Sequence, residues 1–147
     1  MNQNQRNGAF LLRFYLLLGV MVSAYFFAAC NKSPDSSVNF GKVVTASDID
    51  SNNAPTALAD TFSTQQKVVY VVAEAKELAP GTRLAAEWAR EGTVTQVSNE
   101  VTATQGYRNS NIEFHMTPGI DGWVPGRYTV QILVNGQRGP KVAFTIK

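Results

Sequence analysis

The chain has 147 residues, about one domain, and a composition typical of a globular protein: 44% hydrophobic, 16% charged and 11 glycines. Its formal charge of +2 comes from Arg6 and Arg13, because without residues 1–29 the basic residues fall from 13 to 11 and equal the 11 acidic ones. A neutral remainder predicts no electrostatic attraction to nucleic acid, and a single cysteine excludes an intrachain disulfide.

The N-terminal segment has the pattern of an export signal. Arg6 and Arg13 are the only charged residues before Lys32, and residues 14–29 form an uncharged, strongly apolar run. Small residues end this run directly before Cys30, and the chain then becomes polar. A basic start, an apolar middle and small residues at the end predict a signal peptide.

The end of that run, Phe27-Ala28-Ala29-Cys30, resembles the lipobox of bacterial lipoproteins. The resemblance implies that residues 1–29 are removed, that the Cys30 thiol receives diacylglycerol, and that the new amine is acylated with a fatty acid such as palmitate. Phe27 departs from the family, which usually has an aliphatic residue there. An uncleaved membrane anchor is the alternative, although 16 residues fall short of the roughly 20 that span a bilayer.

Residues around Cys30 also bear on location and domain boundaries. Asn31 stands where lipoproteins kept in the inner membrane often have Asp, so the resemblance favours the periplasmic face of an outer membrane in a Gram-negative cell. Residues 31–42 are rich in Ser, Asn, Asp and Pro, which predicts a flexible tether. The folded domain is therefore expected at 43–147.

Within this domain, alternating apolar and polar residues predict short, half-buried strands. The pattern is clearest in residues 67–75, 82–89, 111–116, 126–134 and 141–147, and weaker in 93–97 and 100–104. Val43-Val44 and Thr61-Phe62 are further candidates for a first strand. Asn135-Gly136 predicts a two-residue hairpin turn, because both residues tolerate positive φ.

Six or seven short strands in about 100 residues predict an all-β, antiparallel two-sheet sandwich, with a small barrel as the alternative. Trp88 on an early strand, and Tyr128 near the start of the penultimate one, resemble the immunoglobulin-like and fibronectin-III-like domains, here without a cysteine pair. The segment 122–128, followed by Val134-Asn135-Gly136, is similar to the end of Ig-like modules in bacterial exported proteins of unknown function.

No group of residues makes a convincing catalytic or metal site. His115, the only histidine, lies two residues from Glu113 and near Ser110, but an ordinary polar strand face explains them better than a catalytic set. Zinc has too few candidate ligands. Asp48, Asp50 and Asn52 resemble the start of a calcium loop, but the glycine and the bidentate Glu expected further on are missing. We therefore predict no catalytic residue, no metal and no cofactor.

Two aromatic residues in predicted loops are the candidate binding residues. Trp123 lies in the turn-rich segment 117–125 and Tyr107 in the expected loop 105–110. Exposed rings there could stack on a sugar or anchor a partner. The alternatives are that Trp123 packs beside Tyr128 as a lid over the sandwich end, and that Tyr107 is an isolated surface ring.

These observations lead to a functional prediction. The chain is expected to be a membrane-anchored envelope lipoprotein that is not an enzyme, binds a protein or another envelope component, and has no nucleic-acid partner. A carbohydrate-binding module that uses the loop aromatics is the alternative, and a small envelope hydrolase is the less favoured one.

Overall fold

The computed structural model describes residues 38–147, and the predicted signal peptide, Cys30 and most of the predicted tether lie outside them. Within the described residues the regular structure is entirely β, as predicted, and is arranged in two sheets. The strands are β1 (Asn39–Ala46), β2 (Thr61–Phe62), β3 (Val69–Leu78), β4 (Arg83–Arg90), β5 (Thr93–Val97), β6 (Val101–Thr102), β7 (Tyr107–Met116), β8 (Gly126–Val134) and β9 (Gln137–Ile146). No helix among residues 38–147 is long and apolar enough to cross a membrane.

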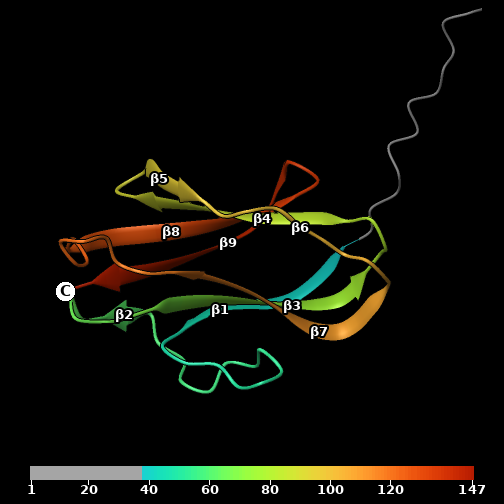
Figure 1. The fold of residues 1–147 in the computed structure, drawn as a ribbon, viewed down its shortest axis with the longest axis horizontal. Coiled ribbons are helices and arrows are strands. Elements are labelled where there is room, and N and C mark those ends of the chain that lie inside the picture. Colours follow the sequence, from blue (N-terminus) through green and yellow to red (C-terminus); the bar gives the residue numbers. More distant parts are fainter. Residues whose placement is uncertain (1–37) are drawn as a thin grey trace, which may run out of the picture. The chain divides into compact units, whose positions relative to one another are not determined.

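The smaller sheet has the order β1-β3-β7, and the larger has β2-β9-β8-β4-β5 with β6 also paired to β4. Figure 1 shows β4, β5, β8 and β9 above β1, β3 and β7. The pairs are antiparallel, as predicted, except that β2 runs parallel to β9. The chain thus passes from the smaller sheet at β1 to the edge of the larger sheet at β2.

Two segments predicted to be irregular are strands. β1 begins at Asn39, inside the expected 31–42 tether, and β7 begins at Tyr107, inside the expected 105–110 loop. Both pair with β3: Asn39 lies opposite Glu77, and Tyr107 lies opposite Leu78. Main-chain pairing to a neighbouring strand does not require apolar alternation, so the polar sequence of these segments misled the prediction.

The C-terminal hairpin forms as predicted. Val134 pairs with Gln137, and the two residues between them have positive φ, 50° at Asn135 and 78° at Gly136. These angles suit the two-residue turns whose twist matches that of the flanking strands. The β8–β9 register shifts between Gln131 and Leu133, and Tyr128, Val130 and Ile132 of β8 are buried in the interior.

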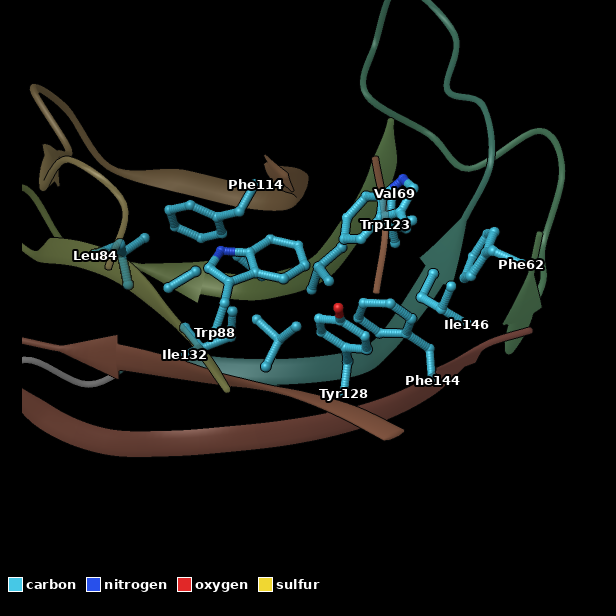
Figure 2. Close-up of a cluster of buried hydrophobic side chains, with 14 of the residues drawn as sticks. Phe62, Val69, Leu84, Trp88, Phe114, Trp123, Tyr128, Ile132, Phe144 and Ile146 are labelled. Atoms are coloured by element: carbon cyan, nitrogen blue, oxygen red, sulfur yellow. The ribbon is translucent and has the colours of Figure 1, made fainter. Parts of the chain in front are cut away.

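The core lies between the two sheets and is dominated by aromatic side chains (Figure 2). Trp88 from β4 is fully buried, which confirms its predicted inward orientation. Its ring meets Phe144 of β9 edge-on, with centroids 6.2 Å apart. The indole N–H of Trp88 has no hydrogen-bond partner among the described residues, and Figure 2 shows it on the side of Phe114. The free energy gained by burying the Trp88 ring must therefore exceed the cost of leaving its N–H without a hydrogen bond.

We expect Trp88→Ala to lower the free energy of unfolding by about 3–5 kcal/mol, because truncating a fully buried aromatic leaves a cavity at the centre of the core. Trp88→Phe should cost less, since it retains an aromatic ring and removes the unpaired N–H. Denaturant unfolding followed by circular dichroism measures both, with the exposed Val97→Ala as control. An unchanged midpoint for Trp88→Ala would contradict the central role of this side chain.

Candidate functional site

Trp123, predicted as an exposed binding residue, is instead part of the interior. Only 5% of it is exposed, its Nε1 donates a hydrogen bond to the Gln66 carbonyl at 2.5 Å, and its ring lies edge-on to Tyr128 with centroids 5.7 Å apart. The ring also meets Phe144 at 6.4 Å. The ring is therefore not exposed in its loop, and it packs beside Tyr128 as in the alternative of a lid (Figure 2).

Tyr128 joins this lid to the core. Its ring stacks on Phe144 at 5.1 Å, and its hydroxyl donates a hydrogen bond to the Val124 carbonyl at 2.8 Å. Burial raises the pKa of the Tyr128 phenol, although the positive charge of Arg90 acts in the opposite direction. The neutral phenol is thus the form that the folded protein favours.

Tyr107, the other predicted binding residue, borders a hollow. It pairs with Leu78 at the end of β3, whereas Trp123 bonds to Gln66 just before the start of β3, so the two residues lie toward opposite ends of that strand. Tyr107 is half-buried at the first position of β7, where it packs against the core. The hollow has a volume of about 580 Å³ and lies between β7, an edge strand of the smaller sheet, and β6, at the edge of the larger sheet. We call it the β6–β7 groove.

The β6–β7 groove has an apolar base and an amide-rich rim. Leu78, Leu84 and Ile112 contribute apolar side chains from both sheets. The rim carries the side-chain amides of four asparagines, which make no hydrogen bond to another described residue: Asn52, Asn53, Asn109 and Asn111. Each free amide offers both donors and an acceptor to a ligand.

Two of these asparagines adopt the left-handed backbone conformation, with φ of 57° at Asn53 and 47° at Asn109. Asn tolerates this conformation better than most residues, but inside a strand it is unusual. Asn109 lies within β7, so the edge strand is locally distorted where it borders the groove. Such distortions concentrate next to binding sites, and they aim a side chain in a direction that a regular strand does not allow.

Few charged side chains line the groove. Glu113 is the one ionisable carboxylate in the lining, and no Lys or Arg contributes to it. The Glu113 carboxylate lies 2.7 Å from Nδ1 of His115, so a partner on its own strand already engages it. The groove thus presents amides, a phenol and apolar surface, and little net charge.

The residues once considered as a catalytic set do not converge. Glu113 and His115 share a face of β7, opposite Val72 and Tyr70 of β3. Ser110 lies on the opposite face of β7, because side chains alternate along a strand. Its hydroxyl donates to the Arg108 carbonyl at 3.3 Å. The structure therefore confirms the His115–Glu113 pair and separates it from the serine.

The calcium-like loop also has a structural explanation. One carboxylate oxygen of Asp50 accepts the backbone N–H groups of Asn52 and Ala54, both at 2.8 Å. This is the turn-forming use of Asp, which satisfies the loop backbone directly. Among residues 38–147, no three His, Cys, Asp or Glu side chains come together as a metal site.

No family model and no curated protein matches this chain. Among solved structures, the chain is similar to the Pseudomonas fluorescens alkylpurine DNA glycosylase AlkC bound to DNA containing an abasic site analog, with 13% identity and a TM-score of 0.42. The similarity covers 76% of this chain and 31% of the glycosylase, so the chain spans about a third of that protein's length.

That structure contains an enzyme and DNA, and so differs from three predictions made from the sequence: an envelope binding module, a protein that is not an enzyme, and a protein without a nucleic-acid partner. We correct these predictions. They rested on missing motifs and on net charge, and neither excludes chemistry or contacts that a fold builds from dispersed side chains. At this identity and TM-score, the glycosylase's DNA and activity do not transfer to this chain.

The Tyr128 phenol gives a pH-dependent prediction. Its pKa is raised in the folded state, so the stability that it contributes is fully present below the unfolded-state pKa of about 10 and is lost as pH rises through the folded-state pKa. Tyr128→Phe should therefore reduce the fall in unfolding free energy above about pH 10, and at neutral pH should cost about 0.5–1.5 kcal/mol for the lost hydrogen bond. Urea unfolding at pH 7–11 measures both effects. Identical alkaline slopes in the two proteins would contradict the assignment.

Proposed function

We propose that the domain binds a small, uncharged organic molecule in the β6–β7 groove. The observation that carries the proposal is the combination of an apolar base with four free asparagine amides in one hollow. Its volume of about 580 Å³ falls within the range of about 300–1,000 Å³ that is usual for ligand sites. Apolar lining with a few convergent polar groups is the usual composition of such sites.

The chemistry of the lining favours a neutral ligand. A phosphate or carboxylate would need Lys, Arg or converging backbone N–H groups, and the lining has no cationic side chain. A cation would have to compete with His115 for Glu113. Asparagine amides instead pair with hydroxyl and amide groups, and the Tyr107 ring provides an apolar face. A molecule with hydroxyl or amide groups around an apolar body fits both.

Saturation-transfer NMR on the full chain in lipid nanodiscs tests this with a set of uncharged, hydroxylated or amide-bearing fragment molecules. We expect several to bind. Ile112→Trp, which fills the groove, should weaken binding by about tenfold or more. Asn109→Gly preserves the left-handed backbone and removes one amide, so it should weaken binding by roughly three- to tenfold, the loss of about one hydrogen bond.

Leu58→Trp is the matched control, because Leu58 is 66% exposed and does not line the groove. It should leave fragment binding unchanged. Absence of any binding fragment, or binding that Ile112→Trp leaves intact, would disprove the groove as a ligand site.

We further propose that lipid on Cys30 anchors the chain to a membrane, on the periplasmic face of the outer membrane in a Gram-negative cell. The support is the lipobox-like sequence before Cys30 and the polar segment after it. Several acyl chains on one residue hold a protein firmly, since each buried methylene contributes about 0.8 kcal/mol. The described domain is proposed to be Ig-like, because the Tyr128 hydroxyl bonds to a backbone carbonyl four residues upstream, as in the tyrosine corner of that fold.

Expression in bacteria fed an alkyne-bearing fatty acid tests the anchor. The wild-type chain should incorporate the label and lose residues 1–29, whereas Cys30→Ser should incorporate none. Click detection on gels and intact mass give the readouts. An unlabelled wild-type chain that retains Met1 would instead support the uncleaved anchor.

A further inference from the structure

The loop between β7 and β8 presents an unusually exposed apolar side chain on a rigid support. Ile120 is fully exposed, at 103% of its reference area. It lies in a tight turn that the Gly122 N–H closes by donating to the Gly119 carbonyl at 3.0 Å. The buried Trp123 follows directly, and the Tyr128 hydroxyl bonds to the backbone of Val124. The turn is therefore anchored to the core on its C-terminal side.

A hollow of about 420 Å³ lies beside this turn. Met116, Pro118 and Val124 give it an apolar character, and Val124 is 48% exposed. Two opposite charges border it, Arg90 at the end of β4 and Asp121 in the turn. Neither makes an ion pair with another of residues 38–147. One surface thus carries a projecting apolar residue, an apolar hollow, and one charge of each sign.

These features are what a twofold-symmetric contact requires. In an isologous dimer each copy uses the same surface patch, so projection and hollow must lie side by side on that patch. A second copy rotated by 180° can place its Ile120 in this hollow while its own hollow receives the first Ile120. The same rotation brings Asp121 of each copy toward Arg90 of the other, which gives two equivalent ion pairs.

We propose that the surface formed by Ile120, Asp121, Arg90 and the adjoining hollow is a self-association site, and that its occupant is a second copy of this chain. A different protein would need an apolar hollow for Ile120 and a cationic side chain for Asp121, and a second copy of this chain already provides both. A bilayer fits less well, because inserting Ile120 would bring the neighbouring carboxylate of Asp121 into the membrane interface. Anchoring both copies to one membrane would favour the contact by raising their local concentration.

Sedimentation equilibrium of the full chain in density-matched detergent micelles tests the proposal. We expect a reversible monomer–dimer equilibrium. Ile120→Ser should raise the dimer Kd by roughly a hundredfold, because a symmetric contact loses two buried isoleucines at once. The control is Leu58→Ser, which removes an exposed apolar residue elsewhere and should leave the Kd unchanged.

A charge exchange separates this contact from nonspecific association. Asp121→Arg and Arg90→Asp should each raise the dimer Kd by about tenfold or more, because each replaces two attractive pairs with two repulsive ones. The double variant carrying both should return to within about threefold of the wild-type Kd. A wild-type chain that stays monomeric, or a double variant that remains as weak as the single ones, would overturn the proposal. Binding of the wild-type monomer to phospholipid vesicles through Ile120 would assign the turn to a membrane instead.

Discussion

The core of the domain is one aromatic cluster of the larger sheet that packs against apolar side chains of the smaller sheet, and the arrangement of the two sheets depends on this packing. Trp88 from β4, Tyr128 from β8 and Phe144 from β9 meet within centroid distances of 5.1–6.2 Å. Aromatic rings bury large apolar areas, so this cluster stabilises the sandwich where it meets core residues of the smaller sheet such as Val69 of β3 and Phe114 of β7. Trp123 extends the same cluster to the domain's end, where it supports the exposed turn at Ile120.

The groove and the turn differ in how they are built. The β6–β7 groove lies where the smaller sheet ends at β7 and the larger sheet has β6 at its edge, so it is a hollow between two strand edges. Its amides come from a distorted edge strand and from a loop far away in sequence. The turn at Ile120 instead projects from a short, well-packed loop. A ligand site and a self-association site at opposite ends would allow a dimer to keep both grooves accessible.

Several features were predictable because they depend on local sequence. Alternation in residues 126–134 gave the orientation of β8, Asn135-Gly136 gave the hairpin, and Trp88 was expected in the core. The corrections share a cause. Tyr107 and Asn39 are strand residues because their segments pair with β3. Trp123 is buried because its N–H bonds to the Gln66 carbonyl and its ring packs against Tyr128. Turn-rich sequence indicates a loop, but it does not indicate whether that loop's aromatic ring points inward.

The sequence by itself determined the all-β class, because strand periodicity and turn residues are local properties. It is also the sole basis for the proposed signal and acylation site, because such motifs are read from the linear chain. Only the tertiary structure decided which side chains form surfaces. The two pairs of groove asparagines, Asn52-Asn53 and Asn109 with Asn111, lie more than fifty residues apart in the chain. Arg90 and the Asp121 turn border one hollow although β5, β6 and β7 separate them in the sequence. Such sites depend on the pairing of distant strands, and no local pattern encodes that pairing.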